Sequence, residues 1–424
     1  MATESAAAAG ALTAIGEEDH GRLLAALART FHDLDLAEEA LADAIVRAVE
    51  TWPDRGVPAS PQAWLMTTAK NRAIDLIRAD ARRARHLARL RIEDERRPGD
   101  HEDHADRLGA DLDSARIPDD RLGLFFTCAH PTLKEPERIA LILRFLAGLS
   151  TAEVAAAFLV DTTTMQQRIV RAKKRITVTG IPFGTPTEEV LGDRLPGVLR
   201  VVYLIFTQGF AATAGPVHAR TDLQEEAIRL ARLLVRLLPD RTEARGLLAL
   251  LLLTRARAEA RVDEHGRPIP LAHQDRRRWD SRLIAEGLWL AQAAAGEQGA
   301  GAYTVQAAIA AVHAEAPTFA ETDWPQILVL YRLLERFEPT PVVALNIAVV
   351  RGKVSGPATG LSALDALGGQ AQLQRHRPYH IARAITLREL GREDDAEAAL
   401  RSALACPGND AESDYLTARI TDDG

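Results

Sequence analysis

The stretch that decides the fold lies at residues 150–179, which read STAEVAAAFLVDTTTMQQRIVRAKKRITVT. It opens with a capping box, in which Ser150 and Glu153 are placed to satisfy free amides in the first turn of a helix. We therefore expect a short helix over 151–158, a turn at 159–161 and a longer helix over 162–179. The longer helix has apolar residues at helical spacing, which predict its buried face: Met165, Ile169, Ala172 and Ile176. A short helix, a tight turn and a longer helix form the helix-turn-helix arrangement, whose second helix enters the major groove of DNA.

The predicted outward face of the longer helix is basic and carries amide side chains. Residues 162–180 contain five arginines and lysines and no Asp or Glu. Glutamine and arginine carry the paired hydrogen-bonding groups that distinguish base edges, and cations also neutralise phosphates. The residues predicted to contact DNA are Thr163, Gln166, Gln167, Arg168, Arg171 and Lys174. The alternative is a charged helix face that only meets solvent.

A second basic helix is predicted upstream, from Pro61 to about residue 85. Ser60 supplies an N-cap, and proline is favoured at the first helical position. Residues 70–89 contain seven arginines and lysines against two aspartates. The DNA-binding candidates on this helix are Lys70, Asn71, Arg72 and Arg78. The alternative is that the two arginines only pair with Asp75 at helical spacing.

The two basic helices are separated by an acidic segment, which we expect to be a flexible linker over residues 93–119. Its glycine, proline, many carboxylates and low hydrophobicity do not favour a packed core. The formal net charge of −7 therefore hides an uneven distribution of charge along the chain. Two basic helices joined by an acidic tether suggest two DNA contacts and a linker that avoids DNA.

Composition places the whole chain in the all-α class. Alanine and leucine dominate, and aromatic residues make up only 5% of the 424 residues. After residue 180 we expect tetratricopeptide-like helical hairpins, with looser examples over 223–256 and 342–367. The clearest spacing is that of Gly391, Ala396, Leu400, Ala403 and Pro407. Because one hairpin cannot bury its own apolar face, the hairpins should stack.

The sequence shows no sign of export, of a metal site or of catalysis. The first residues have no basic region before an apolar run, and the leucine-rich run 246–253 is too short to span a bilayer. We therefore expect a cytoplasmic protein that does not contact a membrane. Cys128 and Cys406 lack metal-ligand spacing and are expected to be small buried thiols. We expect no cofactor, no metal and no enzymatic activity.

Three parts of the chain resemble bacterial sigma factors of the extracytoplasmic-function (ECF) type. Residues 37–41, 63–65 and 70–78 look like region 2 of these factors, and residues 136–176 look like region 4. The motifs at 274–280, 306–313 and 322–324 resemble the helical extension of one ECF subgroup. The resemblance implies sigma region 2 at 1–92, the acidic linker at 93–119, the region 4 helix-turn-helix at 120–180 and a tetratricopeptide-like extension at 181–424.

The resemblance also implies partners, namely promoter DNA and the clamp and flap of core RNA polymerase. In such factors, region 2 binds the clamp and reads the minus-ten element as an opened strand, whereas region 4 reads the minus-thirty-five duplex. The implied polymerase-binding residues lie around an apolar strip and are Asp35, Glu38, Glu39 and Asp43. Their alternative is an ordinary solvated acidic face. Within the turn-rich loop over 53–59, residues 54–59 would form a pocket for a flipped base.

The extension carries one cluster of polar and aromatic residues, Gln274, Asp275, Arg276, Arg278 and Trp279. We expect a buried network that locks helices, or a protein-docking face, because no nucleophile, metal set or phosphate loop accompanies it. In the resembled subgroup the extension regulates activity within the same chain, which implies packing on region 2 or region 4. The extension could also have a regulator of unknown identity.

Two other classes of function stay open at this point. A helix-turn-helix transcription regulator with a helical-repeat sensor domain would bind duplex DNA but not core polymerase. A helical-repeat adaptor or enzyme with incidental basic helices would have no salt-dependent affinity for DNA.

Overall fold

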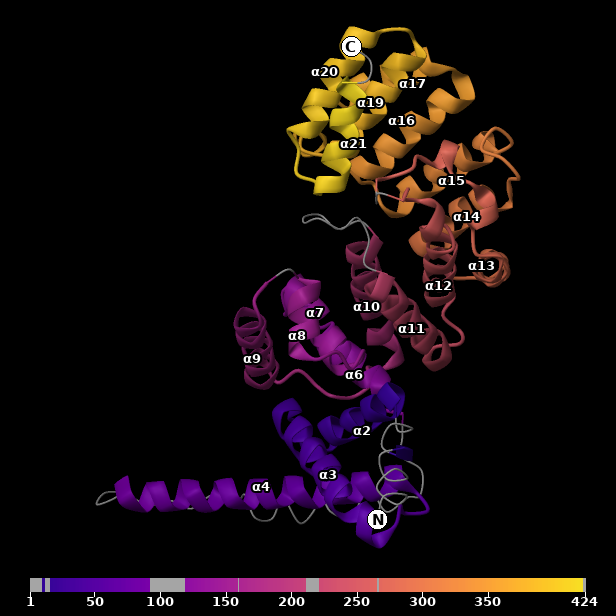
Figure 1. The fold of residues 1–424 in the computed structure, drawn as a ribbon. Coiled ribbons are helices and arrows are strands. Elements are labelled where there is room, and N and C mark those ends of the chain that lie inside the picture. Colours follow the sequence, from indigo (N-terminus) through magenta and orange to yellow (C-terminus); the bar gives the residue numbers. More distant parts are fainter. Residues whose placement is uncertain are drawn as a thin grey trace. The chain divides into compact units, whose positions relative to one another are not determined.

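The computed structural model describes residues 10–11, 16–91, 119–158, 160–210, 221–264 and 267–421. Within these ranges every regular element is a helix, and a single isolated antiparallel bridge joins Val262 to Pro268. The predicted all-α class is therefore confirmed. The chain divides into two compact units, 1–201 and 202–424, whose helices are labelled in Figure 1. Of the acidic linker predicted over 93–119, all but residue 119 lies outside the described residues.

The first unit contains two groups of helices and the start of a connecting helix. The bounds are α2 Gly16–Phe31, α3 Leu34–Arg55, α4 Pro61–Arg91, α6 Arg121–Cys128, α7 Glu135–Phe145, α8 Thr151–Ala157, α9 Thr162–Thr179 and α10 Glu188–Phe210. Helix α3 packs on both α2 and α4, and α7 packs on α6, α8 and α9.

Helix α3 approaches its neighbours closely because alanine lines one of its faces. The fully buried alanines are Ala37, Ala40, Ala44 and Ala48. The helix starts where the side chain of Asp33 accepts the amides of Asp35 and Leu36 at 2.8 and 3.1 Å. Such a cap satisfies amides that have no partner within the helix. The break between the first two helices, which the sequence predicts near residues 33–35, is confirmed.

The loop predicted over residues 53–59 is shorter than expected, because α3 continues through Pro53 to Arg55. A proline in the last turn removes one backbone hydrogen bond, a loss that the end of a helix tolerates better than its middle. Gly56 ends the helix at a φ of +80° and donates its amide to the carbonyl of Trp52 at 3.0 Å. Glycine suits this conformation because it has no Cβ.

Helices α8 and α9 form the predicted helix-turn-helix. The amide of Glu153 donates to Ser150 Oγ at 3.2 Å, and the amide of Ser150 donates to Glu153 Oε2 at 2.7 Å, which confirms the capping box. Gly180 ends α9 in the left-handed conformation, at a φ of +62°. The predicted stripe is also confirmed, with exposures between 0 and 5% for Met165, Ile169, Ala172 and Ile176.

The residues that follow α9 pack back onto α6. Thr127 Oγ1 donates to the carbonyl of Pro182 at 2.7 Å. Arg194 of α10 donates to the carbonyl of Phe126 at 2.5 Å, and its guanidinium carbon lies 5.4 Å from the centroid of that ring. Residues 181–201 therefore belong to the same compact unit as the helix-turn-helix.

The second unit is a series of helices joined by short connections. The bounds are α11 Thr221–Leu237, α12 Thr242–Arg255, η1 Ala258–Ala260, η2 Leu271–His273, η3 Arg276–Arg278, α13 Ser281–Ala295, α14 Ala302–Glu315, α15 Trp324–Phe337, α16 Pro341–Ser355, α17 Pro357–Ala366, α18 Ala371–Gln374, α19 Arg377–Glu389, α20 Glu393–Leu404 and α21 Asp410–Thr421. Hairpins occur at the three predicted places, as α11–α12, α16–α17 and α19–α20.

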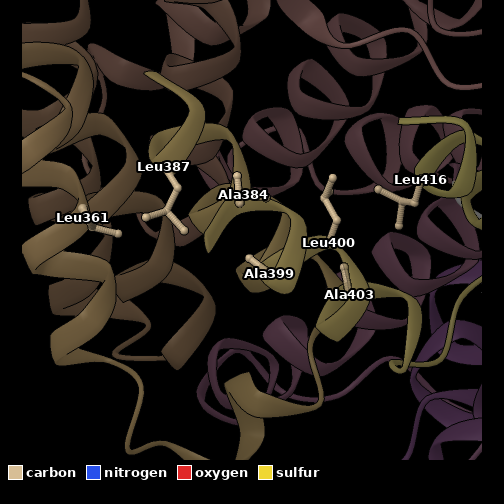
Figure 2. Close-up of a cluster of buried hydrophobic side chains, with 8 residues drawn as sticks. Leu361, Ala384, Leu387, Ala399, Leu400, Ala403 and Leu416 are labelled. Atoms are coloured by element: carbon tan, nitrogen blue, oxygen red, sulfur yellow. The ribbon is translucent and has the colours of Figure 1, made fainter. Parts of the chain in front are cut away.

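The last hairpin buries small and large apolar residues alternately. Figure 2 shows Ala384 and Leu387 of α19 beside three residues of α20 in the same cluster, Ala399, Leu400 and Ala403. Leu361 of α17 and Leu416 of α21 join the same cluster, so the hairpin does not bury its face alone. The stacked hairpins follow the predicted pattern, whereas their assignment to the tetratricopeptide class stays a prediction.

Two contacts fix how helices of the second unit approach each other. At the crossing of α16 and α17, a Cβ on Gly360 would lie 2.7 Å from the Cα of Gly352, so only glycine fits there. At the start of α14, the amides of Gly301 and Thr304 each donate to Glu243 of α12 at 2.9 Å, and the amide of Tyr303 donates at 3.0 Å. Gly301 occupies the N-cap position but has no side chain that could accept these amides, so the Glu243 carboxylate caps α14 instead.

Within the part of the chain that the structure describes, no helix has both the length and the apolar character that a membrane span needs. Over the same residues, no group of His, Cys, Asp or Glu side chains is arranged to hold a metal ion. Cys128 and Cys406 are both buried and unbridged, as the sequence predicts.

Candidate nucleic-acid and protein-binding surfaces

The starts of α8 and α9 are held by carboxylates that stay ionised. Asp161 accepts the hydroxyl of Thr164 at 2.6 Å and its amide at 2.7 Å. These hydrogen bonds lower the pKa of Asp161. The hydrogen bonds that Glu153 accepts from Ser150 likewise lower its pKa. Both caps therefore persist in mildly acidic solution and hold the helix-turn-helix in shape.

Helix α9 presents a polar face to solvent, on the side away from the buried stripe. The exposed DNA-binding candidates on this face are Thr163, Gln166, Gln167, Arg171 and Lys174. Arg171 donates its Nε to the carbonyl of Gln167 at 3.2 Å, which directs its guanidinium along the helix surface. Arg168 differs, because it is only partly exposed and its guanidinium carbon lies 5.1 Å from the centroid of Phe158. Five of the six candidates thus share an accessible face, and the sixth packs on the end of α8.

The same face contains a valine that the sequence analysis missed. Val170 is 53% exposed and lies between the exposed Gln167 and Arg171. Apolar contact with the methyl group of thymine is one way in which a helix in the major groove distinguishes bases. The signal was present in the sequence, because position 170 falls outside the stripe that predicts the buried face.

The candidates on α4 have different surroundings. Asn71, Arg72 and Arg78 are exposed, and Lys70 is partly buried. Arg72 forms an ion pair with Asp43 of α3 at 2.5 Å, and this contact raises the pKa of Arg72. Its partner is therefore an acid on the neighbouring helix, not the nearby Asp75 that helical spacing suggested. Arg72 joins α4 to α3 in addition to facing solvent.

The four carboxylates predicted to bind another protein also divide into separate settings. Asp35 and Glu38 both pair with Lys173 of α9, and Glu38 also pairs with Arg144 at the end of α7. Asp43 pairs with Arg72, and Glu39 is exposed. Half of the acidic face of α3 is therefore already occupied by the helix-turn-helix part of the same chain.

Two exposed valines, Val46 and Val49, lie farther along α3 than these carboxylates. They are 55% and 54% exposed, next to the exposed Glu50. Large apolar side chains that face solvent beside charged residues are typical of surfaces that bind another protein. Helix α3 thus offers a mixed acidic and apolar face beyond the part that α9 covers.

The cluster at 274–279 holds helices together. Arg276 donates to the carbonyls of His313 and Ala316, each at 2.6 Å, at the end of α14. Carbonyls at a helix end have no partner within the helix, so this side chain satisfies them. The guanidinium carbon of Arg276 lies 4.4 Å from the ring centroid of Trp279, which is 6% exposed.

The other members of this cluster have local contacts. Gln274 donates its side-chain amide to the carbonyl of Ile269 at 3.0 Å. Asp275 pairs with Arg277 at 2.9 Å, and this contact lowers the pKa of Asp275. Arg278 is exposed. Within this cluster the contacts that reach another helix come from Arg276, whereas Asp275 and Arg278 are exposed, so the expected buried network does not include these two residues.

A second arginine approaches the same tryptophan. The guanidinium carbon of Arg257 lies 5.4 Å from the Trp279 centroid. Burial, reinforced by Arg276, lowers the pKa of Arg257 to about 10. Burial and the two arginines lower the pKa of His313 to about 4, so this histidine is neutral at pH 7. A group with that pKa is poorly suited to general acid–base catalysis near neutral pH.

Comparisons with known proteins match three separate parts of the chain. Residues 17–83 match the family described as Sigma-70 region 2, and residues 126–176 match Sigma-70, region 4. Residues 194–295 match a family of unknown function, DUF6596. An uncharacterized protein of Rhizobium meliloti (strain 1021) is 42% identical over 397 residues, which are 94% of this chain and 92% of that protein. No solved structure matches the chain.

Proposed function

We propose a function from the premise that this chain belongs to the sigma-70 family and is a sigma factor for transcription initiation, with regions 2 and 4. Within that family we assign it to the ECF type, regulated by its own C-terminal extension. Region 2 would occupy residues 1–92, the linker 93–119, region 4 residues 120–180 and the extension 181–424. Core RNA polymerase and promoter DNA are its partners.

The observation that carries this proposal is the exposed face of α9. Its glutamines, arginine and lysine lie on one accessible side of a capped helix-turn-helix, opposite a fully buried stripe. This is the arrangement with which such a helix reads base edges in the major groove. Region 4 would therefore bind the minus-thirty-five duplex, with Val170 adding an apolar contact.

Region 2 would bind the opened minus-ten strand through α4 and the loop before it. Asn71 and Arg78 are exposed on α4, where they can meet bases and phosphates. The connection at 56–60 is short and ends next to α4, so it can form one wall of a pocket for an unstacked base. A strand that is already open presents its pairing edge, and a few polar groups suffice to read it.

The clamp of core polymerase would bind the acidic and apolar face of α3, including Asp35 and Glu38, which pair with Lys173 in the free chain. Glu39, Val46 and Val49 are exposed there, and Asp43 lies beside them in its pair with Arg72. Apolar contacts of this kind contribute affinity, whereas the carboxylates contribute orientation and the rate of association. We assign the contact with the flap to region 4.

The extension would regulate the factor from within the same chain. Its helical hairpins pack on one another, which supports the proposed tetratricopeptide-like class, and the Arg276 network fixes the junction between η3 and α14. Stacked hairpins provide extended surfaces for other proteins. A regulator of the extension is therefore expected to be a protein or peptide.

Reconstituted transcription with core polymerase on a library of genomic fragments tests the central proposal. The chain should direct initiation to a defined set of promoters. A variant with Gln166→Ala and Gln167→Ala should still bind core polymerase but lose or change that promoter set. Gln326→Ala, an exposed glutamine of α15, is the matched control. A chain that binds duplex DNA but not core polymerase would instead favour a helix-turn-helix regulator.

Regulation by the extension has its own test. Arg276→Gln should loosen the end of α14 and change promoter output several-fold at equal occupancy of core polymerase. Arg278→Gln, which alters an exposed neighbour, should leave the output unchanged. Equal output from both variants would show that the packing of the extension does not control activity.

A further inference from the structure

We propose that region 4 closes over region 2 through an electrostatic latch, and that core polymerase must open this latch in order to bind. The latch consists of Asp35 and Glu38 of α3 with Arg144 and Lys173 of region 4. This inference rests on the proposed function, because it names how polymerase access is regulated.

Lys173 is built into the latch and is separate from the DNA-binding face. Its side chain is only 11% exposed, although it lies in the basic helix α9. Its ammonium donates to Glu38 Oε2 at 3.3 Å and pairs with Asp35, and it lies 5.9 Å from the centroid of the buried Phe145 ring. Its neighbour Lys174 is exposed. A cation held between two carboxylates and a ring is positioned to bind protein.

Arg144 provides the second cation from a different helix. It pairs with Glu38, and it also donates to the carbonyl of Leu149 at 3.2 Å. That second bond holds the guanidinium in place. Glu38 is 26% exposed in this arrangement, so water weakens the pairs less than it would on an open surface.

The contact continues along α2. Arg29 pairs with Asp120 at 3.2 Å. Just beyond region 4, the ring of Phe183 lies 6.3 Å from that of His32. Helix α6 also packs on α2. The latch therefore closes one end of a larger contact between regions 2 and 4.

Closure should lower the affinity of the chain for core polymerase more than its affinity for duplex DNA. Region 4 and the clamp compete for Glu38, which is only 26% exposed and pairs with both Arg144 and Lys173. Asp35 also pairs with Lys173 but keeps 67% of its side chain exposed. By contrast, Gln166, Gln167 and Arg171 stay exposed in the closed arrangement. The free factor would keep its duplex-reading face accessible but present only part of its clamp-binding face.

Energy transfer between dyes at positions 67 and 178, both exposed, tests closure in the full chain. Arg144→Ala and Lys173→Ala should each lower the transfer. Arg175→Ala is the matched control, because Arg175 pairs with Glu137 inside region 4 at 3.5 Å, and it should leave the transfer unchanged. Unchanged transfer in both alanine variants would overturn the latch, whether or not polymerase binds.

Affinity for core polymerase tests the competition. Arg144 belongs to neither the clamp-binding nor the DNA-binding residues. The Arg144→Ala variant should bind core polymerase about ten-fold more tightly, because a larger fraction of the free chain is then in the open form. If energy transfer falls but the affinity for core polymerase does not change, region 4 closes over region 2 as proposed but does not compete with the clamp. Failure of the natural chain to bind core polymerase would instead contradict the proposed function, and the two failures are thereby distinguished.

Discussion

Removal of the Glu243 carboxylate should selectively loosen helix α14. Four hydrogen bonds converge on this side chain, from the amides of Gly301, Tyr303 and Thr304 and from the Thr304 hydroxyl at 2.7 Å. Glu243→Gln keeps the shape but removes the charge and places donor hydrogens where α14 presents donors. Loss of a helix cap costs about 1 kcal/mol, and loss of the charge at a helix start costs up to about 1 kcal/mol more. We therefore expect a loss of about 2 kcal/mol.

Hydrogen exchange of the full chain measures this loss locally. A change of about 2 kcal/mol corresponds to roughly 30-fold faster exchange for amides of α14 that open locally. Amides of α20, which belong to a different apolar cluster, should be unaffected. Glu335→Gln, an exposed carboxylate on α15, is the matched control. Unchanged exchange in α14, or an equal acceleration in α20, would refute the argument that Glu243 acts as the cap of α14.

Three further predictions concern the candidate surfaces and the buried histidine. Because the pKa of His313 falls to about 4, the unfolded chain binds a proton there that the folded chain does not, so the stability that this histidine contributes is lost as pH falls from 6.5 toward 4. Between pH 7 and pH 5 this contribution to the free energy of unfolding should drop by about 2 kcal/mol. His313→Gln should reduce the drop measured in urea titrations by that amount, and the lowered pKa values of His20, His130 and His376 should account for a remaining part. Val170 is 53% exposed, so its burial against a thymine methyl group would contribute about 1 kcal/mol to DNA binding. Val170→Ala should therefore weaken the preference for thymine at one position about five-fold in selection from randomised duplexes. An unchanged preference would place Val170 outside the contact with DNA. Lys174→Ala should lower the slope of log affinity against log salt by about 0.9 for duplex DNA without changing sequence preference, whereas an unaltered slope would mean that Lys174 contacts no phosphate.

The helix-turn-helix could be predicted because its determinants are local. A buried stripe at helical spacing and the box of Ser150 and Glu153 depend on residues a few positions apart, and the structure contains both. The end of α3 was predicted wrongly because Pro53 was interpreted as the start of a loop. In a final turn, a proline costs one hydrogen bond, and Gly56 is the residue that stops the helix.

The partners of the charged residues could not be predicted from local pattern. The sequence shows an acidic helix and a basic helix, but periodicity does not reveal that Glu38 and Lys173 meet, because they come from distant parts of the chain. The same limit applies to Arg257 and Trp279, which meet where non-periodic segments pack together. Val170 is a different case, since its place outside the stripe was visible in the sequence.

The two buried thiols have a practical consequence for chemistry on the intact protein. Cys128 is fully enclosed in α6, where burial raises its pKa, and Cys406 is 7% exposed. A thiol reacts with maleimides as its thiolate, so both native positions should stay unmodified while the chain is folded. A cysteine introduced at a solvent-facing site should then be alkylated alone, and the natural background need not be replaced first. Modification of Cys128 would in turn report that the α6 core has opened.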